Sequence, residues 1–295
     1  MAVSLPMTTP ESIRDLAGQR LMLGFDGIEF NPDLAHIIED LRAGGIILFS
    51  RNVESPDQVR QLCRSCQTAA AECNLPPLFI AVDQEGGTVE RLKEGFTRFP
   101  GNRYITTAEE ARRVARITAG ELADVGINMN YAPVLDVVET TPDSIMRERA
   151  FPGDARRVAK LGTAMIETYQ SEGIMAVAKH FPGIGRTVLD SHFHLPTLDI
   201  DPEVLAESDM IPFTAAIKAG VSGIMLSHIF YPRLDDKWQA SLSVSIARRL
   251  LRDRIGYKGL IMTDDLDMKA IDHDMPTCIR QILDAQVDLA LICHR

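Results

Sequence analysis

Short uninterrupted apolar runs alternate along this chain with longer stretches of helical periodicity. The runs that we interpret as strands span residues 19–25, 44–49, 77–82, 126–135, 174–178, 220–226, 259–262 and 287–293. Apolar runs without polar alternation are typical of strands that are buried on both faces, as in parallel sheets. The pattern therefore predicts about eight parallel strands, each joined to the next by a helix.

The segments between these runs carry helix-start signals. The longest predicted helices cover residues 56–73, 107–125, 154–172 and 243–254, with shorter ones near 10, at 32–41, from 201 and before 287. Ser55-Pro56 and Thr107 with Glu110 are typical helix N-termini. No linker or shift in composition divides the chain, so the alternation predicts one TIM (β/α)8-type barrel domain over residues 1–295. An open doubly wound sheet is the alternative, but no G-x-G-x-x-G follows the first strand.

Polar side chains gather where the predicted strands end. They are Asp26, Asp83, Asp136, Lys179, His180, His228 and Asp264. In a TIM barrel the carboxyl ends of the strands carry the catalytic groups. The pattern therefore predicts a polar bowl ringed by carboxylates, which suits a hydroxyl-rich substrate better than an apolar one.

The richest polar stretch is residues 179–192, KHFPGIGRTVLDSH, which we interpret as an active-site loop. Asp190 and His192 point the same way if the loop is extended, so the carboxylate can bond the imidazole. Such a pair is an acid/base suited to neutral pH, although a surface contact without a role is the alternative. Gly183 and Gly185 are expected to let the loop fold back over the barrel mouth.

Asp264 follows a predicted strand directly and could be a nucleophile, a metal ligand or a helix cap. Asp265 is better placed to be the cap. The nucleophile interpretation needs a proton donor, and His192 is the best candidate. An aspartate with a proton donor is the equipment of a retaining glycosidase, although those enzymes normally use two carboxylates.

Three further groups are expected at the same end of the barrel. Asp83, ahead of Gly86-Gly87, suits bidentate bonding to sugar hydroxyls or a turn. Arg149 and Lys179 could bind substrate oxygens or balance the carboxylates. A zinc site built from His192, His194, His228 and Asp264 is the metal alternative, but it would leave Asp190 idle. We therefore expect no metal.

Composition narrows the class of protein. The net charge of −10 argues against a nucleic-acid partner. The first fifteen residues lack the pattern of a signal peptide, and no apolar run has the length of a membrane span. Five cysteines, an odd number, favour a reducing, cytoplasmic location. Cys63 and Cys66 form a C-x-x-C without a second pair, so we expect free thiols on a helix face. The oligomeric state is not predicted.

Four motifs in register resemble glycoside hydrolase family 3. They are VDQEGG at 82–87, APVLD at 132–136, KHFPG at 179–183 with DSH at 190–192, and TDDL at 263–266. They are most similar to the single-domain β-N-acetylglucosaminidases of peptidoglycan recycling. The resemblance runs in order over nearly the whole chain.

The resemblance implies a retaining, cofactor-free mechanism. Asp264 matches the nucleophile, His192 the general acid/base and Asp190 its partner in a dyad. The positions expected to bind N-acetylglucosamine in the terminal subsite are Asp83, Arg91, Arg149, Lys179 and His180. The implied substrate is N-acetylglucosamine joined to 1,6-anhydro-N-acetylmuramic acid, with or without its peptide. Another family 3 glycosidase, a phosphorylase or a non-catalytic sugar-binding homologue are the alternatives.

Two departures from the family pattern affect these expectations. Ile184 stands where the family loop usually has histidine, so we expect altered loop packing rather than lost catalysis. The chain stops at the eighth strand, without the helix that normally closes the barrel. We expect either a truncated sequence or an apolar groove left bare beside the first and eighth strands.

Overall fold

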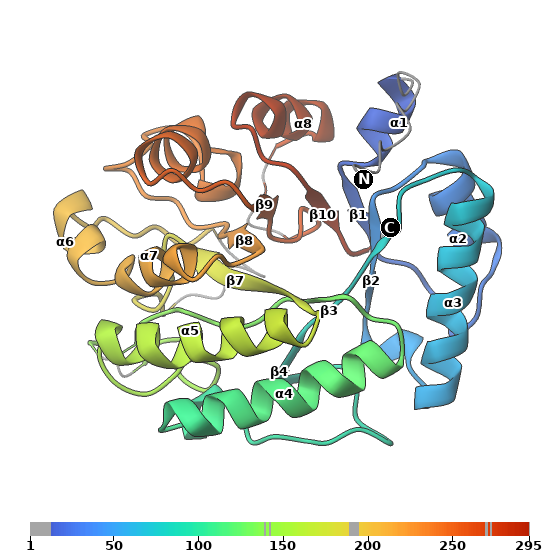
Figure 1. Cartoon of the computed structure of the whole chain (residues 1–295). Coiled ribbons are helices and arrows are strands. Elements are labelled where there is room, and N and C mark those ends of the chain that lie inside the picture. Colours follow the sequence, from blue (N-terminus) through green and yellow to red (C-terminus); the bar gives the residue numbers. More distant parts are fainter. Residues whose placement is uncertain are drawn as a thin grey trace, which may run out of the picture.

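An eight-stranded parallel sheet forms the centre of the molecule (Figure 1). The computed structural model describes residues 13–138, 140–141, 143–188, 195–268, 271 and 273–294. The strands are β1 (Leu21–Leu23), β2 (Gly45–Leu48), β3 (Phe79–Val82), β6 (Met129–Asn130), β7 (Met175–Phe181), β8 (Gly223–Leu226), β9 (Leu260–Thr263) and β10 (Ala290–Ile292). Their order is β10-β1-β2-β3-β6-β7-β8-β9, and a parallel bridge between Met262 and Leu289 links the two ends. This confirms the predicted barrel.

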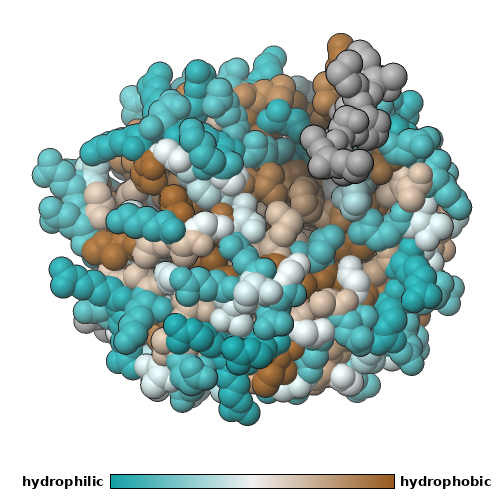
Figure 2. All heavy atoms as spheres, viewed as in Figure 1, coloured by the Kyte–Doolittle hydropathy of each residue, from teal (hydrophilic) through white to brown (hydrophobic). Residues whose placement is uncertain are grey.

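Helices surround the strands in an outer ring (Figure 1). They are α1 (Ile13–Gly18), α2 (Pro32–Ala35), α3 (Pro56–Glu72), α4 (Ala108–Asp124), α5 (Ala155–Ser171), α6 (Pro202–Glu207), α7 (Ile211–Lys218) and α8 (Met275–Asp284). Two π-helical segments lie at His36–Asp40 and Val244–Arg254, and a small hairpin pairs β4 (Gln84–Gly86) with β5 (Val89–Glu90). Viewed from the same side, hydrophilic side chains cover the outer helices, and apolar ones show toward the middle (Figure 2).

The long helices begin where their capping residues predicted. The hydroxyl of Ser55 accepts a hydrogen bond from the N–H of Gln58 at the start of α3. Thr107 and Glu110 form a reciprocal capping box at the start of α4. Each cap satisfies a backbone donor that the first helical turn leaves unpaired. The local sequence therefore defines these ends well.

Most predicted strands differ from the structure by a few residues at their ends, and two of the differences affect the site. The run 126–135 contains only the two-residue strand β6, and beyond it an isolated parallel bridge joins Val134 to Lys179. The strand predicted at 174–178 instead extends to Phe181, which pairs with Leu226 of β8. Lys179 and His180 therefore lie on β7, and their assignment to the following loop was wrong.

The barrel interior is a separate apolar layer. Its members are Met22, Ile47, Ala81, Met129, Tyr131, Val177, Met225, Met262, Leu289, Leu291 and Cys293. A larger core lies between the strands and the outer helices. The interior is packed with side chains, as in other barrels of this kind, so any ligand is held above this layer at the ends of the strands.

All five cysteines are free thiols. Cys63 and Cys66 are buried on α3, and burial raises the pKa of each thiol to about 12. The interpretation of this C-x-x-C as free helix-face thiols is confirmed. Within the described ranges, no three His, Cys, Asp or Glu side chains group as a metal site would require. In the same ranges, no helix is both long and apolar enough to cross a membrane.

Candidate active site

A cavity of about 540 Å³ opens at the carboxyl ends of the strands. All six described residues that the sequence singled out for catalysis or sugar binding line it: Asp83, Arg91, Arg149, Lys179, His180 and Asp264. Asp190 and His192 lie outside the described residues. The cavity therefore collects the described candidates from β3, β5, β7, β9 and the segment before α5.

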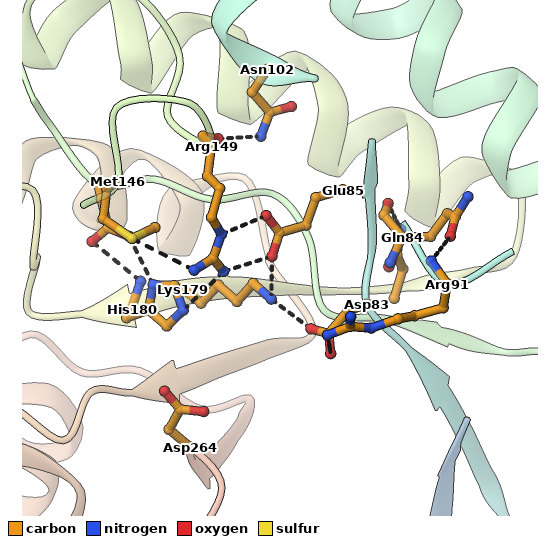
Figure 3. Close-up of polar contacts among 12 residues, drawn as sticks. Asp83, Gln84, Glu85, Arg91, Asn102, Met146, Arg149, Lys179, His180 and Asp264 are labelled. Carbon is orange, nitrogen blue, oxygen red and sulfur yellow. Dashed lines mark hydrogen bonds and ion pairs between the residues drawn. The ribbon is translucent and has the colours of Figure 1, made fainter. Parts of the chain in front are cut away.

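A buried ion network forms one wall of the cavity (Figure 3). Lys179 Nζ lies 2.7 Å from Asp83 Oδ1 and 2.6 Å from Glu85 Oε1. Arg149 donates to both oxygens of Glu85, over 3.0 Å from Nε and 2.8 Å from Nη2. Charge-assisted bidentate contacts of this kind fix both side chains in orientation. Glu85 thus joins Lys179 on β7 to Arg149 on a distant loop.

Glu85 and Lys179 stay ionised in this network despite their burial. Burial alone would raise the pKa of Glu85, but Arg149 and Lys179 lower it to about 2. Burial disfavours the charged amine of Lys179, yet Asp83 and Glu85 outweigh it and raise its pKa. Glu85 therefore carries no proton at neutral pH, which excludes it as a general acid.

The hairpin β4–β5 positions Arg91 at the rim. The side-chain oxygen of Gln84 accepts hydrogen bonds from the backbone N–H groups of Arg91 and Leu92, at 2.9 and 3.0 Å. The Arg91 guanidinium lies 3.4 Å from Asp83 Oδ2 and 5.4 Å from the centre of the Phe49 ring. Its Nε is buried without a partner among the described groups. Arg91 therefore keeps a donor for a ligand.

His180 is oriented by a carboxylate beneath it. Asp136 is fully buried, and its Oδ2 lies 2.8 Å from His180 Nδ1. Because a carboxylate accepts, Nδ1 carries the proton, and Nε2 faces the Arg149 guanidinium at 3.5 Å. Asp136 also accepts from the N–H of Ile184 at 2.8 Å. The Asp136 carboxylate thus fixes the orientation of the His180 ring and also anchors the backbone at the start of the next loop.

Asp264 lies directly after β9, opposite the ion network (Figure 3). Its N–H donates to the carbonyl of Leu226 at 3.1 Å, which anchors it to the neighbouring strand. Burial opposes ionisation, but His228, His180 and the N–H of Asp265 outweigh it and lower the pKa of Asp264. The cavity therefore presents an ionised carboxylate that is available as a nucleophile.

His228 is a structural neighbour of this carboxylate. Its Nε2 donates to the carbonyl of Asp265 at 2.8 Å, so Nδ1 accepts from the Ser241 hydroxyl at 2.6 Å. Burial lowers the pKa of His228 despite the nearby Asp264. Both ring nitrogens of His228 are therefore engaged in contacts within the protein.

Two sequence interpretations are wrong in detail. Asp265 does not cap a helix: its Oδ1 accepts from the N–H groups of Asp267 and Cys293, and Asp274 caps α8. Asp26 is exposed and pairs with Arg51 at 2.8 Å. It lines a second cavity of about 390 Å³ beside the first rather than the main bowl. Strand ends alone do not tell which side chains face the axis.

The described start of the loop after β7 is packed tightly. Gly183 has φ = 127° and Gly185 lies so close to Val137 that an added Cβ would sit 2.0 Å from its carbonyl oxygen. Ile184, between the two glycines, is buried. Arg186 pairs with buried Asp209 at 2.8 Å. The two glycines therefore permit close packing at these positions, where the sequence had suggested freedom of movement.

Sequence reasoning missed three polar groups here: Glu85, the role of Asp136, and Tyr131, which lines the cavity. Glu85 follows Asp83 by two residues, so a continued strand would have placed both carboxylates on one face. That spacing was a usable signal. The partners of Asp136 and Tyr131 come from distant segments and leave no local pattern.

Comparison with known proteins finds relatives along nearly the whole chain. The model described as "Glycosyl hydrolase family 3 N terminal domain" matches residues 11–295. A "Beta-hexosaminidase" from Methylobacillus flagellatus is 36% identical, over 93% of this chain and 80% of the relative. "Beta-hexosaminidase A" from Pseudoalteromonas piscicida is 35% identical, over 99% of this chain and 54% of the relative.

Solved structures give the same result. A glycoside hydrolase family 3 β-N-acetylglucosaminidase from Paenibacillus sp. str. FPU-7 superposes with a TM-score of 0.94 at 39% identity, over 97% of this chain and 55% of that one. Native NagZ from Neisseria gonorrhoeae superposes with a TM-score of 0.85 at 31% identity, over 94% and 81%. The chain thus spans about half the length of some relatives and about four fifths of others.

Proposed function

The chain belongs to glycoside hydrolase family 3, and on that basis we propose that it is a retaining exo-β-N-acetylglucosaminidase. The observation that carries the proposal is the Asp264 carboxylate, whose pKa is lowered, in one cavity with the buried ion network of Asp83, Arg149 and Lys179. A retaining glycosidase needs a nucleophile of this kind below the anomeric carbon. The names of the relatives point to the same activity.

We propose that five side chains hold the terminal N-acetylglucosamine. Asp83 and Lys179 are already paired, so each offers its remaining lone pairs or protons to sugar hydroxyls in a fixed direction. Arg91, Arg149 and His180 add donors and an imidazole edge around the same space. Because the ion network is formed before substrate arrives, little reorganisation opposes binding.

Two displacements at the anomeric carbon make up the reaction. An Asp264 oxygen bonds to C1 while the C1–O bond to the leaving group breaks, and His192 gives its proton to the departing oxygen. Water then attacks C1 as His192 takes up its proton, and the bond to Asp264 breaks with the electron pair returning to the carboxylate. Asp190 holds the imidazole in the required tautomer.

We propose peptidoglycan fragments as the substrate class, with N-acetylglucosamine removed from 1,6-anhydro-N-acetylmuramic acid units. The support is the resemblance to single-domain peptidoglycan-recycling enzymes and the likeness to NagZ. A cytoplasmic site of action and a single catalytic domain remain part of the proposal. Five free thiols agree with a reducing compartment.

A chromogenic N-acetylglucosaminide assay tests the activity. We expect release of the chromophore, and product analysis on muropeptide fragments should show free N-acetylglucosamine. Repeating the assay in phosphate distinguishes hydrolysis from phosphorolysis, which would yield the sugar 1-phosphate. Inactivity on every sugar glycoside, with saccharide binding retained, would favour a non-catalytic sugar-binding protein.

Asp265 is the competing candidate for the proton donor. It lines the cavity, and burial raises its pKa despite two backbone hydrogen bonds. Its Oδ1 is occupied by the N–H groups of Asp267 and Cys293, which suits a structural carboxylate. With His192→Ala we expect the largest loss on substrates with poor leaving groups, and recovery on activated ones. If Asp265→Asn instead shows that dependence, Asp265 is the acid.

A further inference from the structure

Tyr131 is an inner-barrel residue that also lines the cavity, and its hydroxyl is unpaired among the groups that the structure describes. It follows β6, belongs to the apolar layer inside the barrel, and also lines the cavity that contains Asp83 and Asp264. The residue is fully buried. Its hydroxyl makes no hydrogen bond to any described group.

The other buried tyrosines of the described chain all have partners. Tyr231 donates to the carbonyl of Gly183 at 2.9 Å, and Tyr257 donates to the carbonyl of Val221 at 3.1 Å. Tyr169 bonds the side chains of Thr118 and Asn130. Buried hydroxyls are normally satisfied, and leaving one unpaired is costly. Tyr131 therefore differs from the other buried tyrosines of the described chain, because its hydroxyl is free to bond a ligand.

The surroundings of Tyr131 indicate what that partner is. Burial raises the pKa of Tyr131 well above its usual value, and the charges of Asp83 and Asp264 act in the same direction. The phenol consequently stays protonated and is a donor. It lines the same cavity as Asp83, the proposed sugar-binding carboxylate, and Asp264, the proposed nucleophile. A pyranose held by Asp83 and attacked by Asp264 must fill this cavity.

We propose that Tyr131 is a specificity-determining residue whose hydroxyl donates a hydrogen bond to a hydroxyl of the terminal sugar in the cavity. The inference rests on the proposed function. A site that hydrogen-bonds a substrate hydroxyl rejects analogues lacking it, because the buried protein group is then left unpaired. Tyr131 thus selects for a sugar that carries this hydroxyl.

Tyr131→Phe tests the role because it removes one oxygen and keeps the ring. We expect kcat/KM on an aryl N-acetylglucosaminide to fall about 10-fold or more. The melting temperature of the unliganded protein should rise by about 1–3 °C, since an unpaired buried hydroxyl is lost. A kcat/KM within about twofold of wild type would overturn the proposal.

Tyr257→Phe is the matched control. It also removes a buried hydroxyl, but at the other end of the barrel and from a satisfied hydrogen bond. Its melting temperature should fall while kcat/KM stays unchanged. A rise in melting temperature for Tyr131→Phe and a fall for Tyr257→Phe would distinguish a hydroxyl that is unpaired without substrate from one that stabilises the fold.

A series of 3-, 4- and 6-deoxy N-acetylglucosaminides identifies the contacted hydroxyl. The penalty of Tyr131→Phe should vanish for the one analogue that lacks this group. The same penalty across the whole series would contradict a contact to a sugar hydroxyl. Calorimetry with N-acetylglucosamine separates the two proposals. If wild type hydrolyses no glycoside but binds N-acetylglucosamine more tightly than Tyr131→Phe does, only the proposed enzyme activity is refuted. If wild type does not bind N-acetylglucosamine at all, both proposals are refuted.

Discussion

Glu85 is the residue on which the buried ion network of the cavity wall depends, since it pairs with both Arg149 and Lys179. Its pKa is about 2 in the folded state, below the ordinary value of 4.5. A depressed carboxyl pKa stabilises the fold fully above pH 4.5, and the effect is lost as the pH falls through 2. The difference corresponds to about 3 kcal/mol.

Denaturant unfolding as a function of pH measures this contribution. Between pH 5 and pH 2, wild type should lose about 3 kcal/mol more stability than Glu85→Gln, whose amide does not titrate. At pH 7 the variant should be about 3–5 kcal/mol less stable, because two buried cations lose a partner. Parallel pH profiles for the two proteins would show that Glu85 is not held as an anion.

Asp136 sets the tautomer of His180, so Asp136→Asn should act on the site more than on the fold. The Asn amide can satisfy Ile184 through its oxygen, but then its NH2 group faces His180 Nδ1. The proton would move to Nε2, toward the Arg149 guanidinium. We expect kcat/KM to fall about 10–100-fold. Nitrogen NMR of His180 reports the tautomer directly. If neither the tautomer nor the kinetics changes in Asp136→Asn, Asp136 does not set the tautomer of His180.

For individual residues, the sequence predicted which side chains line the cavity better than it predicted their contacts. Asp83, Lys179 and Asp264 were found because each follows or ends a buried strand. Glu85 and Asp136 were not assigned roles because their partners are 64 and 44 residues away. Distances of that kind follow from barrel closure and leave no trace in local spacing.

Among the elements, the packed segment after β7 offers the sharpest test. A methyl group on Gly185 would meet the Val137 carbonyl at 2.0 Å, a backbone group that cannot swing aside. Gly185→Ala should therefore cost about 2–3 kcal/mol and reduce kcat, since the loop that continues to Asp190 and His192 must shift. Thermal unfolding and kinetics measure the two effects.

Gly120→Ala supplies the control for that variant. Gly120 lies within α4, and an added Cβ there meets nothing within 4 Å. Alanine should stabilise this helix position by about 0.5–1 kcal/mol and leave kinetics unchanged. If Gly185→Ala behaves in the same way, the segment after β7 is not held by this close contact.

The order and type of the elements were predictable, whereas several bounds were not. Helix starts at Ser55 and Thr107 follow from local capping chemistry. The length of β7 depends on the pairing of Phe181 with Leu226, which is set by a neighbouring strand. This tertiary pairing moved Lys179 and His180 from the predicted loop onto the strand.

For the whole molecule, the barrel brings groups from distant segments to one cavity, and the proposed chemistry there uses only side chains. In the proposed mechanism Asp264 supplies the electron pair and His192 the proton, so the reaction requires no metal. Prolonged treatment with a strong chelator should leave kcat and KM unchanged. Loss of activity that one divalent metal restores would instead support the metal-hydrolase alternative.

The fold class followed from the βα rhythm, because eight buried strands with helical crossovers leave few other closed arrangements. The position of the site followed as well, since the strands end on one side. Which hydroxyls the cavity recognises did not follow, because that depends on ångström-scale placement of groups such as Tyr131.

A trapped intermediate would show directly whether Asp264 forms a covalent bond to the sugar. A 5-fluoro N-acetylglucosaminyl fluoride should glycosylate Asp264 and leave the glycosyl-enzyme in place, because the ring fluorine slows hydrolysis of this intermediate more than its formation. Mass spectrometry of the intact protein, followed by peptide mapping, measures the adduct. We expect one added sugar on the peptide that contains Asp264, and none in Asp264→Ala. Full turnover by Asp264→Ala, or an adduct on another residue, would contradict the proposed mechanism.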